Sequence, residues 1–275
     1  MGKKIFWLYL LIPVVSTIIA SGFKSTAVTI GVLVLSLAVT AFLLRAEIMM
    51  LAATLTFSKN REKSLALMKK AYQTGKLNPS AQLMYAYIVL RSGDLDSAEA
   101  MINKITYLGK NILSKAELKK ADFNRALICW KRGNLSDAIM MLEQLYSDGY
   151  LTSDMYNTLG YFYIANNETD KAIELTKEGI DFAPDNLVTA DNLGQAYIMA
   201  GMLDEAQKLY ETLIPKNPEF IEAYFNYATL LERRGMLSEA RDNYEKALEY
   251  EEKFFSTVSR EQVAAALTHV EELLK

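Results

Sequence analysis

Residues 159–163 read Leu-Gly-Tyr-Phe-Tyr, and residues 193–197, 34 positions further on, read Leu-Gly-Gln-Ala-Tyr. Leucine, glycine and tyrosine therefore recur in the same order, and the next position in this register holds Tyr227-Ala228. Further residues keep the same interval, namely Ala172, Ala206 and Ala240 together with Pro184 and Pro218. A repeat of this length indicates stacked two-helix units, because such a unit buries its apolar face only against its neighbours.

The apolar residues within one unit share a helical face. Tyr156, Leu159, Gly160 and Tyr163 lie three, one and three positions apart, which places them on one side of a helix. The glycine allows a second helix to approach closely, and the repeated alanine does the same from the second helix. Each unit is therefore expected to be a tightly packed helix pair.

The turns inside the units carry glycine, which ends a helix in the left-handed conformation. The glycines concerned are Gly133, Gly201 and Gly235. A serine or aspartate follows each of them, and these side chains are expected to cap the second helices. They are Ser136, Asp204 and Ser238.

This pattern resembles the tetratricopeptide repeat family. The resemblance implies an all-α, right-handed α-solenoid of about five to six repeats over residues 45–275. The expected units are 45–78 (degenerate), 79–112, 119–152, 153–186, 187–220 and 221–254. About six residues exceed the family period, and we expect them between Gly109 and Leu118. Ser259-Arg260-Glu261-Gln262 predicts a capping box that opens a C-terminal capping helix over residues 259–275.

Two apolar segments, residues 5–20 and 27–44, precede the repeats and are separated by a short polar turn with a glycine. With their flanking residues, both reach the ~20 residues that cross a bilayer. We predict a transmembrane helical hairpin in residues 1–44, which contacts the lipid bilayer through residues 5–44. The alternative is a cleaved signal peptide with Lys3-Lys4 as its basic start, but the second uncharged segment favours the hairpin.

Basic residues are concentrated outside the hairpin turn. Lys3 and Lys4 precede the first segment, whereas the turn contains only Lys24. The basic residues after the second segment are Arg45, Lys59, Arg61 and Lys63. Because cytoplasmic flanks carry the excess of Lys and Arg, we expect both termini and the repeats in the cytoplasm. The membrane would be a bacterial inner or plasma membrane.

The composition argues against several functions. A formal net charge of −3 lacks the basic surface that nucleic-acid binding requires. The one cysteine, Cys129, and the one histidine, His269, are too far apart in a stacked array to act together. No phosphate-binding glycine loop, G-x-S-x-G or H-E-x-x-H motif occurs. We therefore expect no enzyme activity, no catalytic residue, no metal, no cofactor and no small-molecule substrate.

In the family, the first helices of successive units line a concave groove that accepts peptides or partner helices. The resemblance implies the groove residues Tyr87, Phe123, Asn124, Leu127, Lys131, Asn157, Tyr161, Asn192, Gln195 and Asn226. Asn124, Asn192 and Asn226 share one position. Their amides could hold a peptide backbone, or they could only brace neighbouring helices. Trp130 is either a binding anchor or a core residue.

The predicted function is a non-catalytic, membrane-anchored scaffold that recruits a cytosolic protein or peptide through this groove. The alternative is a structural or assembly subunit of a larger integral membrane complex. A secreted or surface adhesion module is a third possibility, and it requires the signal-peptide interpretation of the first segment.

Overall fold

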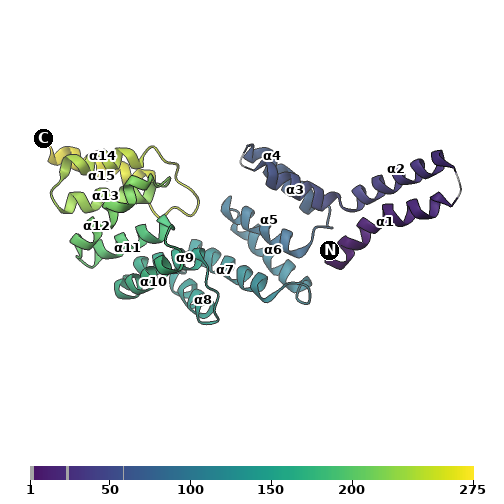
Figure 1. Cartoon of the computed structure of the whole chain (residues 1–275). Coiled ribbons are helices and arrows are strands. Elements are labelled where there is room, and N and C mark those ends of the chain that lie inside the picture. The colour runs from purple at the N-terminus through teal and green to yellow at the C-terminus, as the bar shows by residue number, and fades with distance from the viewer. Residues whose placement is uncertain (1–2, 23–24, 58) are drawn as a thin grey trace. The chain divides into compact units, whose positions relative to one another are not determined.

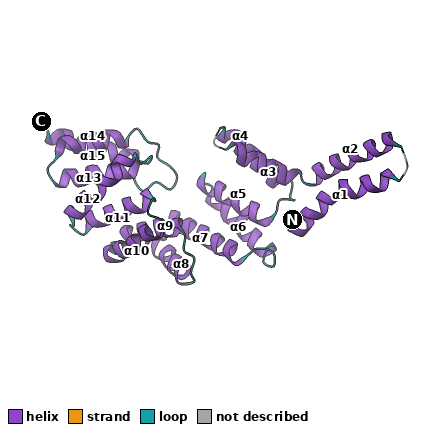
Figure 2. Ribbon diagram, in the orientation of Figure 1, coloured by secondary structure: helices purple, strands orange, loops and turns teal. Residues whose placement is uncertain are grey.

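The computed structural model describes residues 3–22, 25–57 and 59–275 (Figure 1). Over these residues the fold is all-α, with fifteen α-helices, one short 3-10 helix and no strand (Figure 2). Contacts group the chain into two compact units, Met1–Ala121 and Asp122–Lys275. The division falls inside helix α7 (Lys115–Lys131), and each unit is described by itself. The domain boundaries expected at residues 44 and 45 stay a prediction.

The first unit begins with two apolar helices, α1 (Lys3–Ser21) and α2 (Thr26–Leu43), which lie side by side (Figure 1). The Thr40 hydroxyl donates to the Tyr9 carbonyl oxygen at 3.4 Å and links the two helices. Among the described residues, only Thr26–Leu43 is long and apolar enough to cross a membrane, with a mean hydropathy of 2.3. The apolar part of α1, Trp7–Ser21, is shorter, so the two-span hairpin stays a prediction.

The remaining helices of the first unit follow α2 almost without interruption. Leu44 alone separates α2 from the next helix. Two helix pairs follow, α3 (Arg45–Thr56) with α4 (Arg61–Gln73) and α5 (Pro79–Arg91) with α6 (Leu95–Leu108). In the α3–α4 pair the buried Ser64 hydroxyl donates to the Ala53 carbonyl oxygen at 2.7 Å. Ala46 and Ala53 of α3 pack with Met68 of α4 in one buried cluster.

The extra residues between the second and third pairs mainly lengthen helix α7. It has 17 residues, whereas α5 and α9 (Ser153–Ala165) have 13 each. Its N-terminus is fixed by a reciprocal cap, in which the Ser114 amide donates to the Glu117 carboxylate at 2.7 Å and the Glu117 amide donates to the Ser114 hydroxyl at 3.2 Å. The insertion therefore adds about one helical turn.

The second unit continues as helix pairs with one final helix. Besides α7 and α9, whose bounds are given above, this unit contains the following helices: α8 (Leu135–Ser147), α10 (Thr169–Phe182), α11 (Leu187–Met199), α12 (Leu203–Leu213), α13 (Ile221–Arg233), α14 (Leu237–Ala247) and α15 (Arg260–Leu273). A short 3-10 helix at Ile214–Lys216 follows α12. The helices α9, α11 and α13 begin at the first residues of the units expected from the sequence.

Close helix approach depends on the repeated glycines. A Cβ atom at Gly160 would lie 2.8 Å from the Thr176 methyl carbon, and one at Gly194 would lie 2.6 Å from the Tyr210 ring. Real Cβ atoms essentially never make such contacts, so an alanine would force the buried Tyr210 ring to shift. The packing role predicted for these glycines is confirmed.

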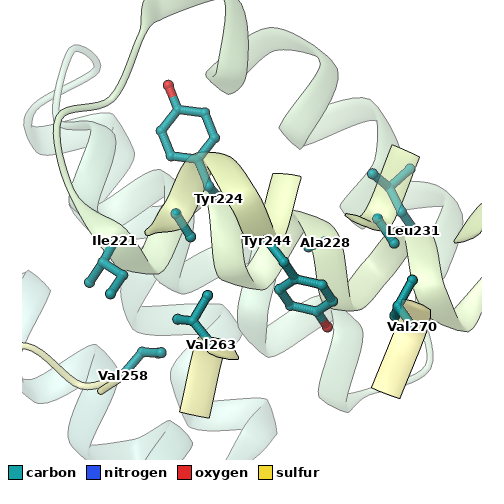
Figure 3. Packing of buried hydrophobic residues seen from close by; sticks show 10 residues of the cluster. Ile221, Tyr224, Ala228, Leu231, Tyr244, Val258, Val263 and Val270 are labelled. Carbon is teal, nitrogen blue, oxygen red and sulfur yellow. The ribbon is translucent and has the colours of Figure 1, made fainter. Parts of the chain in front are cut away.

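Helix α15 covers the last apolar surface (Figure 3). Its Val263 and Val270 pack with Ile221, Tyr224 and Tyr244 of the preceding pair, and all five side chains are buried. The predicted capping box is confirmed, because the Ser259 hydroxyl accepts from the Gln262 amide and the Gln262 side chain accepts from the Ser259 amide. An array of repeats needs such a terminal helix for solubility.

The glycine turns are confirmed, but the predicted N-caps are wrong. Gly133, Gly201 and Gly235 all have positive φ, and Asn167 takes this role between α9 and α10 with φ 59°. Helices α8, α12 and α14 begin two residues earlier than expected, so Ser136, Asp204 and Ser238 occupy the second helical position. Asp204 there accepts a hydrogen bond from Arg234 at 2.9 Å and lies favourably near the positive end of the helix dipole.

Candidate functional site

The connection between α14 and α15, residues 248–259, is long and has no helix of its own (Figure 1). We call it the crossing loop. Its ends are tied to neighbouring elements, because the Arg260 guanidinium donates to the carbonyl oxygens of Leu248 at 2.6 Å and Tyr250 at 2.8 Å. The Tyr250 ring stacks on Tyr224 of α13, with centroids 5.3 Å apart and planes at 8°. The loop therefore has a defined path.

The middle of the crossing loop contacts α7, more than 100 positions earlier in the same unit. The Phe255 ring stacks on Trp130 with centroids 6.2 Å apart and planes at 22°. The Lys131 ammonium lies 5.0 Å from the Phe254 ring centre and 5.8 Å from that of Phe255. It also lies 4.3 Å from the Trp130 ring. One cation thus faces three aromatic rings, an arrangement that cation–π attraction stabilises.

Helices α9 and α13 complete the surface that the loop covers. The Thr257 amide donates to the Glu222 carboxylate in the first turn of α13 at 2.8 Å. Tyr161 of α9 meets the Trp130 ring edge-on, with centroids 5.8 Å apart. Burial and the charge of Glu222 raise the pKa of Tyr161, while a hydrogen bond with Thr257 opposes the rise. We call Trp130, Lys131, Tyr161 and Glu222 the Trp130 surface.

The charge of the Trp130 surface is shaped by burial. Burial lowers the pKa of Lys131, and the negative charge of Glu252 in the crossing loop opposes this effect. The Glu252 carboxylate also accepts from the Arg260 amide at 3.0 Å. A partly desolvated cation and an acidic segment therefore lie on the two sides of the contact. This arrangement can bind an extended acidic chain with aromatic side chains.

The predicted groove residues have different surroundings in the structure. Lys131 and Tyr161 belong to the Trp130 surface, and Gln195 is half-buried on α11. Phe123 and Leu127 are buried, each with 5% of its surface exposed, so they are core residues rather than exposed contacts. Tyr87 lies in the first unit, where the Arg91 guanidinium is 5.9 Å from its ring. Trp130 is partly buried and contacts the loop.

The buried asparagines brace neighbouring helices. The Asn192 side chain donates to the Asn157 carbonyl oxygen at 2.8 Å and joins α11 to α9. The Asn157 side chain accepts from Asn186 at 3.1 Å. The Asn226 amide donates to both carboxylate oxygens of Asp191, at 3.2 and 3.1 Å. Asn192 and Asn226 are buried and hydrogen-bonded, so bracing is the interpretation that the structure supports for these two. Asn124 is 1% exposed, and its side-chain nitrogen has no hydrogen-bond partner among the described residues.

Sequence reasoning did not find the crossing loop. It predicted the final helix but assigned no role to Phe254 and Phe255 before it. The available signal was this pair of adjacent aromatic residues, which directly follows the charged residues Glu251, Glu252 and Lys253. Large apolar side chains in such a connection usually have a surface to cover.

A second surface lies on α8, α9 and α10. A shallow pocket of about 250 Å³ is lined by Tyr146, Tyr163, Lys171, Glu174, Leu175 and Glu178. Its polar groups already have hydrogen-bond partners, since the Tyr146 hydroxyl donates to Glu178 and the Tyr163 hydroxyl donates to the neighbouring Glu143 at 2.8 Å. Within the part of the chain that the structure describes, no group of His, Cys, Asp or Glu could hold a metal ion.

Comparisons with known proteins agree with the repeated helix pairs. Two family profiles, both described as tetratricopeptide repeat, match residues 163–226 and 221–254. The uncharacterized protein ycf37 of Cyanophora paradoxa is 29% identical over 121 residues, which cover 42% of this chain and 70% of that protein.

Solved structures of repeat proteins are also similar. A tetratricopeptide repeat protein from Parabacteroides merdae has a TM-score of 0.61 and 12% identity, covering 88% of this chain and 93% of that one. TTC0263, a thermophilic protein of Thermus thermophilus, has a TM-score of 0.55 and 20% identity, covering 69% and 99%. The pilF protein of Pseudomonas aeruginosa has a TM-score of 0.55 and 14% identity, covering 72% and 84%. At these identities the likeness shows the fold alone.

Proposed function

We propose that this chain, whose residues 163–226 and 221–254 match tetratricopeptide repeat profiles, is a membrane-anchored scaffold that recruits a cytosolic protein or peptide. Repeat proteins of this family typically act as non-catalytic scaffolds that mediate protein–protein interaction. The observation that carries the proposal is the Trp130 surface. It already holds an extended polypeptide segment through stacking, cation–π and main-chain contacts, which are the contacts that a recruited peptide requires.

The end of α2 supports the membrane anchor. The Arg45 guanidinium lies 4.2 Å from the Phe42 ring centre, and the Lys76 ammonium lies 5.7 Å from it. Aromatic rings and basic side chains are typical of the membrane–water interface, where the cation reaches the headgroups. This pairing at the end of the apolar helix Thr26–Leu43 sets the expected interface at Phe42. The repeats then begin directly at that interface.

A structural subunit of a membrane complex is the second candidate, and helix α3 favours it. Ile48, Leu51 and Leu55 are 48%, 61% and 69% exposed on this helix just after the span. Exposed apolar side chains of this kind fit contact with lipid or with another membrane protein. A discrete, stoichiometric complex after detergent solubilisation would favour the subunit. A mostly free chain would favour the scaffold.

The scaffold proposal is tested by partner capture from membranes with the full chain as bait. We expect Tyr161→Ala to reduce recovery of a captured partner at least tenfold, because it removes a ring from the Trp130 surface. Asn192→Ala is unsuitable, since it removes a helix brace. Met140→Ala is the matched control, because Met140 is 63% exposed on α8 and makes no contribution to this surface. Equal recovery with both variants would show that the Trp130 surface does not bind the partner.

A further inference from the structure

We propose that residues 251–257 are a built-in ligand of the Trp130 surface, and that the partner presents a segment of the same chemistry. That segment has two acidic residues, one further residue and then two adjacent aromatic side chains, and it displaces the crossing loop. The inference rests on the proposed function, because it identifies the kind of partner that this surface recruits. It adds that the surface is occupied before the partner arrives.

The aromatic part of the built-in ligand defines the first requirement. Phe255 stacks on Trp130, and Phe254 lies closer to the Lys131 ammonium than Phe255 does. The two phenylalanine rings also contact each other, with centroids 5.1 Å apart. A single aromatic side chain could satisfy only one of these positions. The geometry therefore selects two adjacent aromatic residues.

The acidic part defines the second requirement. Glu251 and Glu252 lie three and two positions before Phe254, with Lys253 between Glu252 and the aromatic pair. The negative charge of Glu252 opposes the lowering of the Lys131 pKa by burial. Lys131 is the cation that faces all three rings, so a negative group two positions before the first aromatic residue balances its charge. Complementary charge at this place sets the direction and register of the bound segment.

The third contact is main-chain and can be made by any sequence. The Thr257 amide donates to the Glu222 carboxylate at 2.8 Å, and every non-proline residue has this donor. This hydrogen bond positions the end of the segment on α13, and it does not depend on the identity of the side chain at that position. Specificity then comes from the aromatic pair and the acidic residues.

The segment is attached loosely enough to be replaced. Glu251, Glu252 and Lys253 are exposed, and Phe254 and Phe255 are only half-buried. The first fully buried side chain is Val258, which packs in the core with α13 and α15. Residues 251–257 therefore lie against the surface, while Val258 and the bonds of Arg260 tether them. A tethered competitor lowers the apparent affinity for a partner by the fraction of time that it occupies the site.

A labelled peptide with the sequence of residues 251–257, Glu-Glu-Lys-Phe-Phe-Ser-Thr, tests the inference. The full chain in detergent micelles is compared with the Phe254→Ala/Phe255→Ala double variant by fluorescence anisotropy. We expect the double variant to bind the peptide at least tenfold more tightly, because its own loop no longer competes. A peptide with alanine at both phenylalanines should not bind. Adding Trp130→Ala to the double variant should abolish binding.

Arg260→Ala provides a second way to free the loop. It removes the two bonds to Leu248 and Tyr250 and leaves the Trp130 surface and both phenylalanines in place. We expect an intermediate gain in peptide affinity. Circular dichroism checks that each variant keeps its helices, and Arg260→Ala decides the outcome if the double variant loses them.

If the peptide bound the wild type and both folded variants with equal affinity, it would bind elsewhere on the chain, and this result would overturn the built-in ligand. If Tyr161→Ala still reduced partner capture at least tenfold, the scaffold function would be retained, and only the proposed chemistry of the partner segment would be rejected. If the loop variants showed no gain in peptide affinity and Tyr161→Ala showed no loss of partner capture, the Trp130 surface would be rejected as a binding site.

Discussion

At the scale of single residues, the Asp191 carboxyl is an ionisable group inside the helical core. It accepts from the Tyr210 hydroxyl at 2.8 Å and from the Asn226 amide, and its side chain is 2% exposed. Burial raises the pKa of Asp191 to about 7, the two hydrogen bonds oppose the rise, and the charge of Glu222 adds to it. The carboxyl links α11, α12 and α13, but its ionised form is disfavoured there.

The raised pKa predicts the pH dependence of stability at this residue. A folded pKa above the unfolded value stabilises the fold below about pH 3.8, and this stability is lost as the pH rises through about 7. Asp191→Asn keeps an acceptor for Tyr210 and cannot ionise. The variant should therefore gain stability relative to wild type as the pH rises from 4 to 7, by up to about 4 kcal/mol at ~1.4 kcal/mol per pKa unit.

Denaturant unfolding at several pH values measures this difference, followed by Trp130 fluorescence in a Trp7→Phe background. Above pH 7 the difference between variant and wild type should be constant. A difference that did not change between pH 4 and pH 7 would show that Asp191 titrates normally in the folded chain.

At the scale of helices and loops, the repeat period predicted where helix pairs lie, but it did not predict how each helix begins. Glycine at a turn needs only a local φ, which is why Gly133, Gly201 and Gly235 could be predicted. Whether Ser238 caps a helix or lies at its second position depends on the backbone conformation of two residues, which the period does not determine. The contact of Phe255 with Trp130 depends on the stacking of several units, so no local pattern encodes it.

The cap of α15 gives a prediction at this scale. Ser259→Ala removes the hydroxyl that accepts from the Gln262 amide at 3.1 Å, and we expect a loss of about 1 kcal/mol in unfolding free energy. Ser238→Ala is the matched control, because Ser238 lies at the second position of α14 and should change stability by less than ~0.5 kcal/mol. Both are measured by denaturant unfolding. A larger loss for Ser238→Ala would reverse our assignment of the helix starts.

At the scale of the whole molecule, the composition of the N-terminal segment and the repeat period each predict one part of the chain. The all-α repeat fold followed from the period, because each two-helix unit buries its apolar face against its neighbours in the same way. The surroundings of the predicted groove residues followed only in part, since Lys131 and Tyr161 lie on the Trp130 surface while Phe123, Leu127, Asn124, Asn192 and Asn226 are buried. The position of a residue in the repeat indicates which helix it belongs to. Whether its side chain is exposed depends on the side chains packed around it, which the repeat pattern does not specify.

The membrane topology is the last prediction. We expect the repeats to face the cytoplasm, because the basic residues that flank the apolar helix Thr26–Leu43 favour that side. A Ser136→Cys variant in a Cys129→Ser background places one thiol at an exposed position of α8. A membrane-impermeant maleimide should label it only after the cells are permeabilised. Labelling of intact cells would put the repeats outside and favour the adhesion module, and N-terminal sequencing of the mature chain would then reveal the cleaved first segment.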